Sequence, residues 1–173
     1  MEEKERIVTM GGNPLTLLGR EIKVGEKAPD CVLIDNDLAP VRLSSFWGQP
    51  CIISSVPSLD TPVCDLETKR FDAEVARFDF EVTMLTISMD LPFAQKRWCG
   101  ATGTGNSRTL SDHREAAFGM AYGVLIKELR LLARALFVAD NQGVVCYTQL
   151  VREISQEPDY DAVLAAVTKI GRR

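Results

Sequence analysis

The chain has 173 residues, and its 46% hydrophobic and 25% charged residues are ordinary for a globular protein with one substantial core. A net charge of −4 argues against a general nucleic-acid surface, which needs clustered Lys and Arg, and gives no support to binding an anionic membrane. The charged N-terminus leads into no apolar stretch typical of a secretion signal, and no apolar run is long enough to cross a bilayer. We therefore expect a single cytoplasmic domain over residues 1–173.

The first fifty residues predict two β-hairpins and a short helical turn. The expected strands, in pairs, are 6–10 with 15–18 and 31–34 with 41–43. The first pair encloses the turn formers of residues 11–14, and the second encloses residues 35–37. Ser44 is expected to cap a turn of helix that runs through Trp47 and ends at Gly48.

The middle of the chain predicts strand–helix units, beginning with an apolar strand over 51–56. One face of the helix that follows carries residues spaced four, three, four and three: Cys64, Thr68, Phe71, Val75 and Phe78. A second strand is expected over 80–88. Asp90 is expected to cap a short helix from Leu91 to about Cys99, which Gly100 stops. The run 101–107 is rich in Gly, Thr and Ser and predicts a mobile loop.

The remaining elements complete an α/β fold. They are a brief strand at 108–110, a helix at 115–122 ended by Gly123, strands at 133–139 and 144–150 joined by a hairpin turn, and a helix at 159–170. Strands that alternate with helices imply a central sheet with parallel members and helices packed on it. The closing hairpin adds antiparallel strands, so we expect a mixed sheet.

Cysteine and histidine usage limits the possible chemistry. Five cysteines, an odd number spread along the chain, suit a reducing cytosol better than a disulfide framework. There is no Cys-x-x-Cys pair, so a zinc site would lack its usual paired ligands. His113 is the only histidine. It would have to serve any cysteine–histidine hydrolase, although its position near a helix start favours a surface or capping role.

The most informative stretch is residues 54–65, where the strand at 51–56 runs into a helix. Thr61 at the N-cap and Pro62 at the first helical position both follow the preferences of helix starts, and Asp60 is the alternative cap. Either choice places Cys64 in the first turn, beside backbone N–H groups without helical partners. Such a position favours a thiolate over a thiol.

The helix start alone is not enough to activate Cys64. A helix terminus contributes about 0.3–1 kcal/mol, and up to about 2 kcal/mol in favourable geometries, whereas lowering a thiol pKa from about 8.5 to about 6 needs roughly 3.4 kcal/mol. A cation or charge-assisted hydrogen bonds, at about 1.5–3 kcal/mol each, should complete the site. Arg134 lies in the apolar run 131–137 and is the candidate cation.

Structural roles remain open for each of these residues. Cys64 lies on the apolar face of its helix and could be a core cysteine, and Arg134 could project from a strand end into water. Packing is the better interpretation for the cysteines in strand patterns, Cys31, Cys51 and Cys146. Cys99 differs because it precedes a glycine-rich run, so we expect it to be accessible or able to move.

These motifs together resemble a known family. Pro57-x-x-x-Thr61-x-x-Cys64 looks like the peroxiredoxin active-site motif, and the run 54–65 closely resembles the thiol peroxidase subfamily, whose members use two cysteines within one chain. The similarity covers nearly the whole chain. It includes the Gly-Asn-Pro hairpin and the runs 90–99, 121–124, 132–135 and 157–160.

The resemblance implies a thioredoxin-like fold with an N-terminal β-hairpin extension, and a role for each candidate residue. Cys64 would be the peroxidatic cysteine and Cys99 the resolving cysteine. Thr61 would hydrogen-bond the thiolate and the peroxide, Pro57 would shield the thiolate, and Arg134 would stabilise it. It further implies reduction of hydrogen peroxide and organic hydroperoxides, an intramolecular Cys64–Cys99 disulfide recycled by thioredoxin, a homodimer, and no metal or other cofactor.

A disulfide needs Cα atoms within about 7 Å of each other. Cys64 starts one predicted helix and Cys99 ends another, so we expect local unwinding around one or both cysteines before they join. Apolar neighbours such as Leu59 and Val63 weakly favour organic hydroperoxides. Two other functions remain possible: a redox sensor that signals to a partner, and a thioredoxin-fold binding module whose cysteines are structural.

Overall fold

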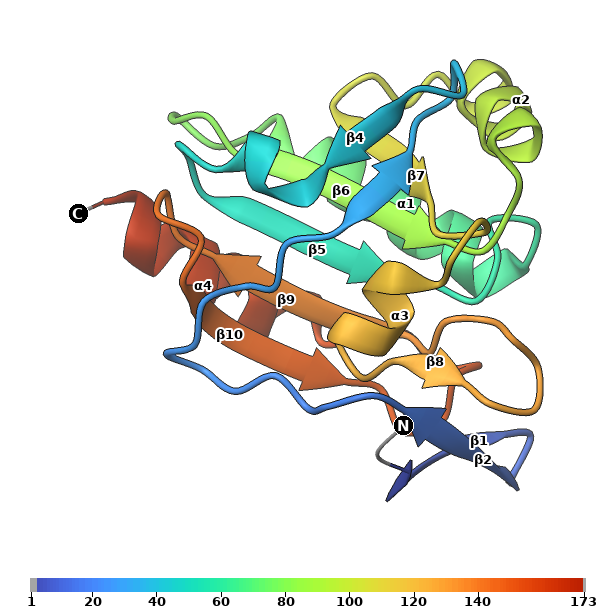
Figure 1. The fold of residues 1–173 in the computed structure, drawn as a ribbon. Coiled ribbons are helices and arrows are strands. Elements are labelled where there is room, and N and C mark those ends of the chain that lie inside the picture. The colour runs from blue at the N-terminus through green and yellow to red at the C-terminus, as the bar shows by residue number, and fades with distance from the viewer. Residues whose placement is uncertain (1–2, 173) are drawn as a thin grey trace.

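The computed structural model describes residues 3–172 and has a seven-stranded sheet at its centre, in the order β10-β9-β5-β6-β7-β3-β4 (Figure 1). The strands are β3 (Val32–Ile34), β4 (Pro40–Arg42), β5 (Cys51–Ser55), β6 (Thr83–Ser88), β7 (Ser107–Ser111), β9 (Ala135–Ala139) and β10 (Val145–Leu150). The pairs β5–β6 and β6–β7 are parallel, and the other neighbours are antiparallel. The predicted mixed sheet is therefore confirmed.

Helices cover both faces of this sheet. They are α1 (Pro62–Val75), α2 (Pro92–Thr102), α3 (Ala117–Ala121) and α4 (Tyr160–Gly171), with a 3₁₀ turn, η1, at Leu43–Phe46. Adjacent strand residues point to opposite faces. Ile52 of β5 accordingly packs in a cluster with side chains of α1 and α4, whereas Ile53 packs in the cluster that includes α3 (Figure 1).

The N-terminal hairpin forms a second, smaller sheet. β1 (Glu3–Met10) and β2 (Asn13–Leu18) pair antiparallel, and β2 also pairs with β8 (Leu125–Ile126), a two-residue strand that the sequence did not predict. The turn is tighter than expected, because Gly11 and Gly12 alone form it. Both adopt positive φ angles, 56° and 82°, which glycine tolerates without steric cost.

The predicted caps at Ser44 and Asp90 are wrong. η1 begins at Leu43 with Arg42 as its N-cap, so Ser44 lies inside the turn. Helix α2 has Leu91 as its N-cap. The Asp90 carboxylate instead accepts hydrogen bonds from the Ser58 and Ser88 hydroxyls, at 2.7 Å each, and from the Leu59 backbone N–H at 2.9 Å. These tertiary partners compete successfully with the helix start for the same carboxylate.

Gly100 does not stop α2, which continues to Thr102. Glycine inside a helix costs only about 1 kcal/mol relative to alanine, so it need not end one. Gly103 ends the helix instead, with a φ of 67°, and donates its N–H to the carbonyl of Cys99 at 3.1 Å. Cys99 therefore lies within the helix, one turn before its end, and the expected loop at 101–107 starts later.

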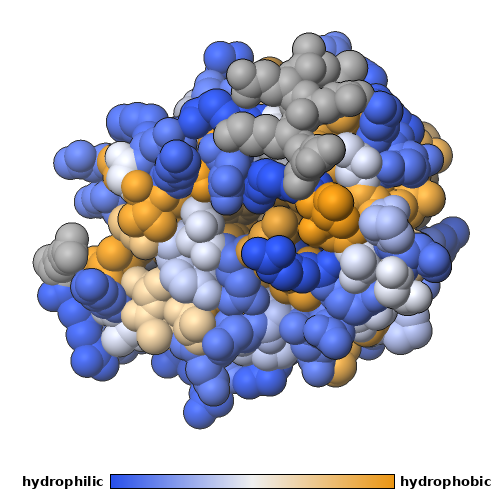
Figure 2. Space-filling view, turned by 90° about the horizontal axis from the view of Figure 1, so that it is seen from below, coloured by the Kyte–Doolittle hydropathy of each residue, from blue (hydrophilic) through white to orange (hydrophobic). Residues whose placement is uncertain are grey.

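Three other predicted boundaries shift inward. Helix α1 ends at Val75, so Phe78 lies beyond it, where its ring packs on Phe80 with centroids 5.0 Å apart. Strand β6 begins at Thr83, and α3 is shorter than the predicted helix at 115–122. Among residues 3–172, no helix is long and apolar enough to span a membrane. Figure 2 shows a largely hydrophilic face with separate apolar areas.

Candidate active site

The site is built at the junction of β5 and α1. Thr61 has an extended backbone and is the N-cap of α1, Pro62 is at the first helical position, and Cys64 lies in the first turn, as predicted. The Thr61 side chain does not cap the helix. Its hydroxyl donates to the Ser58 carbonyl at 2.8 Å and so braces the preceding loop, and the residue itself is exposed.

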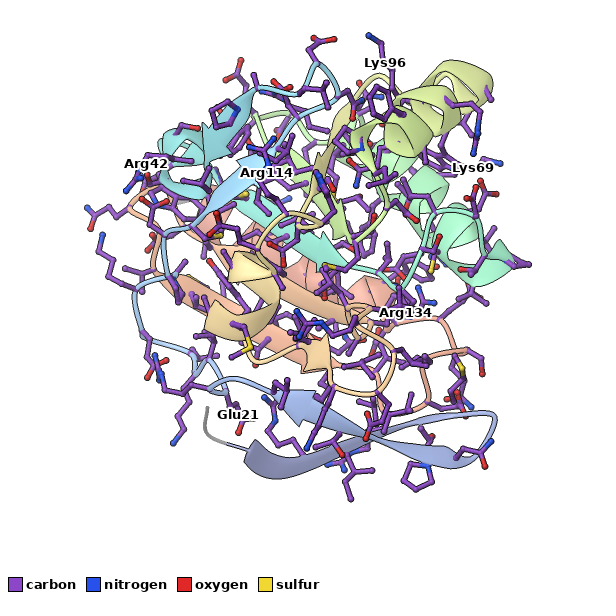
Figure 3. All side chains as sticks on the ribbon, turned by 45° about the vertical axis from the view of Figure 1, so that its right-hand side comes forward. Glu21, Arg42, Lys69, Lys96, Arg114 and Arg134 are labelled. Carbon is purple, nitrogen blue, oxygen red and sulfur yellow. The ribbon has the colours of Figure 1, made fainter. Side chains whose placement is uncertain are left out.

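Arg134 is the partner of Cys64. The sulfur of Cys64 is fully buried, and Nη2 of Arg134 donates a hydrogen bond to it at 3.2 Å. Arg134 is itself only 1% exposed, so it does not project into water. Figure 3 shows it beside the turn that leads into α1. A buried cation that donates to sulfur favours the thiolate, because charge-assisted hydrogen bonds are the strong ones.

Glu67, which the sequence reasoning missed, orients Arg134. Its fully buried carboxylate accepts from Nη1 of Arg134 and from the Ser54 hydroxyl at 2.9 Å. Burial raises the pKa of Glu67, against the opposing effects of Arg134 and Ser54. Burial lowers the pKa of Arg134, but the charge of Glu67 and the Cys64 sulfur outweigh it and leave that pKa raised. The sequence did carry a signal for this residue: Glu67 lies three positions after Cys64 and therefore on the same, apolar face of the helix, where a charged side chain needs a buried partner.

The backbone carbonyl of Ile154 fixes the rest of the guanidinium. It accepts from Nε of Arg134 at 3.0 Å and from Nη2 at 2.8 Å. The segment that carries it is held by the N-terminal hairpin. Ile154 donates its N–H to the Thr9 carbonyl at 2.9 Å, and Thr9 donates to the Arg152 carbonyl at 2.7 Å. Three groups therefore hold Arg134 in place: a carboxylate, a carbonyl and the sulfur.

An apolar cluster surrounds the Cys64 sulfur. It consists of buried side chains from the loop after β5 and from two helices: Val56, Leu59, Cys64 and Trp98. Pro57 is buried at the start of that loop, between β5 and α1. Because Asp90 binds both Ser58 and Leu59, the loop is tied to the start of α2. These contacts leave Cys64 with no surface exposed to water in this structure.

Cys99 packs at the edge of this cluster but has different polar partners. It is half-buried, and its sulfur contacts the Thr109 hydroxyl at 3.3 Å and the Asn36 amide at 3.8 Å. Both Cys64 and Cys99 are free thiols, so this is the reduced form of the pair. The structure thus brings Cys64 and Arg134 into contact, places Pro57 and Thr61 on the segment that leads into α1, and puts Cys99 on a neighbouring helix.

The other three cysteines lie outside the apolar cluster around Cys64. Burial, with smaller effects from Asp112 and Asp30, raises the pKa of the Cys31 thiol to about 12. Cys51 is fully buried in β5, and burial raises its pKa too. Cys146 is half-buried on β10, where its thiol contacts the Val144 carbonyl. A thiol with a raised pKa is a poor nucleophile at neutral pH, which suits packing roles for Cys31 and Cys51.

Comparison with known proteins agrees with this geometry. A family described as Redoxin matches residues 23–164. The thiol peroxidase of Oceanobacillus iheyensis is 52% identical over 162 residues, which are 94% of this chain and 98% of that protein. A peroxiredoxin-like protein from Aquifex aeolicus superposes with a TM-score of 0.89 at 43% identity, covering 95% of this chain and 97% of its own. A thiol peroxidase from Chromobacterium violaceum gives 0.85 at 25% identity, with 96% and 97% covered.

These likenesses extend over the sheet, the helices and both cysteine-bearing segments. The predicted thioredoxin-like fold is confirmed, since a mixed sheet flanked by four helices is the arrangement that the peroxiredoxin structures share. The chain therefore belongs to the redoxin family and, within it, to the thiol peroxidase group of the peroxiredoxins.

Proposed function

We propose that this protein is a thiol-dependent peroxidase that reduces hydrogen peroxide and organic hydroperoxides, with Cys64 as the reacting thiol. One observation carries the proposal: the buried sulfur of Cys64 lies in the first turn of α1 and accepts a hydrogen bond from the buried Arg134 at 3.2 Å. The helix start and this cation together supply the thiolate stabilisation that neither provides alone. The thiol peroxidases among its relatives support the same activity.

The first step is attack of the Cys64 thiolate on the terminal oxygen of the hydroperoxide. The oxygen–oxygen bond breaks, Cys64 becomes a sulfenic acid, and the leaving oxygen takes a proton to depart as an alcohol or as water. Arg134 and the free N–H groups of the first turn are the donors available to the peroxide oxygens as charge moves onto them, and the Thr61 hydroxyl joins them when it turns its proton from the Ser58 carbonyl to the peroxide. Pro57 shields the thiolate from solvent.

The second step joins Cys64 to Cys99. The Cys99 thiol condenses with the sulfenic acid, so a disulfide and one water form. In the reduced structure each sulfur has its own partners, Arg134 for Cys64 and Thr109 with Asn36 for Cys99. One or both cysteines must leave these partners before the sulfurs can bond, so we propose that the start of α1 or the end of α2, or both, unwinds locally at this step.

A dithiol protein completes the cycle. We propose thioredoxin, as the resemblance to the thiol peroxidases implies, and it restores both thiols by disulfide exchange. The cycle as proposed requires no metal, haem or flavin. A cytoplasmic location suits the odd number of cysteines, five, spread along the chain. We further propose that residues 1–173 form a single domain and that the protein is a homodimer. Antioxidant defence is the cellular role that fits peroxide reduction.

A coupled assay tests the proposal. Peroxide-dependent NADPH oxidation is followed with thioredoxin and its reductase, using hydrogen peroxide and several alkyl hydroperoxides as substrates. Sustained turnover is the expected result. A redox sensor would instead be oxidised once and turn over poorly, and a binding module with structural cysteines would consume no peroxide. Either result would reject the proposal.

A further inference from the structure

The sulfur of Cys99 belongs to a small polar ring that joins three elements. Cys99 comes from α2, Thr109 from β7, and Asn36 from the turn between β3 and β4. The Thr109 hydroxyl lies 3.3 Å from the sulfur and 3.0 Å from Oδ1 of Asn36, and Nδ2 of Asn36 lies 3.8 Å from the sulfur. Thr109 is buried and Asn36 is half-buried, so the ring is partly protected from solvent.

The direction of the three hydrogen bonds follows from counting protons. A threonine hydroxyl has one proton, and that of Thr109 is donated to Oδ1 of Asn36. At the contact between Cys99 and Thr109 the donor must therefore be the S–H group. Asn36 then donates its amide N–H to the sulfur, which closes the ring. This arrangement suits a protonated, neutral Cys99.

We propose that Asn36 and Thr109 are positioning residues that retain Cys99 as a thiol within α2 and thereby set the rate at which the Cys64–Cys99 disulfide forms. The inference rests on the proposed role of Cys99 in the reaction. The proton that the ring holds is the one that leaves with the sulfenic oxygen as water when the disulfide closes. Release of the ring is therefore a part of the resolving step.

Among the described residues, the hydrogen bonds of the Cys99 side chain all lie in this ring. A surface pocket of about 250 Å³ adjoins Cys99, Asn36 and Thr109, so the cysteine can move without displacing the core. Helix α2 ends at Thr102, three residues after Cys99. An ion pair between Lys96 and Asp37 also links α2 to the same turn, but both side chains are largely exposed, so it adds little.

The ring also has a consequence for damage by peroxide. A sulfenic acid that is not resolved can react with a second peroxide to give a sulfinic acid. Slower release of Cys99 lengthens the life of the sulfenic acid at Cys64, so a larger fraction of the protein is converted to the sulfinic acid. Weakening the ring should therefore both accelerate disulfide formation and protect the protein from over-oxidation.

Thr109→Val tests the inference, because valine keeps the shape of the buried side chain and removes the hydroxyl. Thr86→Val is the matched control: Thr86 lies opposite Thr109 in the β6–β7 register, is equally buried, and its hydroxyl has no hydrogen-bond partner among the described residues. Rapid mixing with hydrogen peroxide, followed by acid quench and mass spectrometry, separates sulfenic acid formation from disulfide formation. The sulfinic fraction is measured at high peroxide.

In Thr109→Val we expect sulfenic acid to form at the wild-type rate. The disulfide should form about three- to tenfold faster, which is the effect of losing one or two neutral hydrogen bonds. The sulfinic fraction should fall as a result. Thr86→Val should behave as wild type. Asn36→Ala, at a half-buried turn position, should change both readouts in the same direction, and it provides the test if Thr109→Val does not fold.

Two results would contradict the inference and are distinguishable from failure of the proposed function. Unchanged or slower disulfide formation in both ring variants, with normal sulfenic acid formation, would overturn the role of the ring alone. Failure of the wild-type protein to form any sulfenic acid would reject the peroxidase function itself, and this inference with it.

Discussion

The indole Nε1 of Trp98 donates a hydrogen bond of 2.8 Å to Oδ1 of Asp65. Trp98 immediately precedes Cys99 and Asp65 immediately follows Cys64, so this bond joins the neighbours of the two proposed reactive cysteines. The indole is 8% exposed and packs against Cys64 in the apolar cluster. Unwinding around either cysteine must disturb this contact, which makes Trp98 a natural reporter of the resolving step.

The first prediction concerns the fluorescence of Trp98. In a Trp47→Phe background, where Trp98 is the only tryptophan, one equivalent of hydrogen peroxide should shift the emission to longer wavelength, because the indole loses its buried contacts as the disulfide forms. Adding Cys99→Ser should abolish the shift. A disulfide confirmed by mass spectrometry without any change in emission would show that the two cysteines join without moving Trp98.

The second prediction separates two roles of Arg134. Arg134→Met leaves the carboxylate of Glu67 buried without its partner, so we expect it to lose about 3–5 kcal/mol of unfolding free energy. The double variant Arg134→Met/Glu67→Met should recover stability in urea unfolding, because it removes both charges. Its Cys64 should still react with peroxide about ten- to a hundredfold more slowly, the effect of one charge-assisted hydrogen bond. A double variant that reacts at the wild-type rate would contradict the role given to Arg134.

The third prediction uses Glu153, whose carboxylate links the N-terminal hairpin to the segment that carries Ile154. Hydrogen bonds from the backbone N–H groups of Ser155 and Gly12 lower its pKa from 4.5 to about 2. The stability this provides is present above the unfolded-state pKa and is lost as the pH falls through the folded-state value. The free energy of unfolding of wild type should therefore exceed that of Glu153→Gln at pH 7, and the difference should shrink between about pH 4.5 and 2. A difference that stays constant over this range would show that the charge of Glu153 is not responsible.

The fourth prediction concerns Cys99. Cys99→Ser should reduce one equivalent of peroxide and then stall as a sulfenic acid, because the thiol that forms the disulfide is missing. Rapid-quench mass spectrometry would show normal oxidation of Cys64, and the coupled thioredoxin assay would show little turnover. Full thioredoxin-dependent turnover in Cys99→Ser would remove this residue from the mechanism.

Sequence reasoning located the parts of the site that depend on local rules. Proline at the first helical position and threonine at the cap placed Cys64 in the first turn of α1, and the structure confirms that placement. The need for a cation beyond the helix start then pointed to Arg134. A helix start stabilises a thiolate by less than the lowered pKa requires, and this shortfall is what indicated a buried cation. The apolar residues around Arg134 did not by themselves show whether its side chain points into the core or into water.

The residues that were missed or misassigned depend on tertiary contacts. Glu67 was overlooked because a charged residue on an apolar helix face is acceptable only when a buried partner is known, and Arg134 is 67 positions away. The ring at Cys99 joins Thr109 to Asn36 across 73 positions, which no local pattern encodes. Asp90 has the sequence of a helix cap, but the loop before α1 supplies better partners for its carboxylate.

The central claim is that Cys64 is the residue that peroxide oxidises. Its most direct test is thioredoxin-coupled consumption of hydrogen peroxide by Cys64→Ser, with Cys146→Ser as the control because Cys146 lies on β10, outside the site. We predict that Cys64→Ser loses turnover completely while it remains folded, and that Cys146→Ser retains wild-type turnover. Peroxide turnover by Cys64→Ser near the wild-type rate would contradict the account.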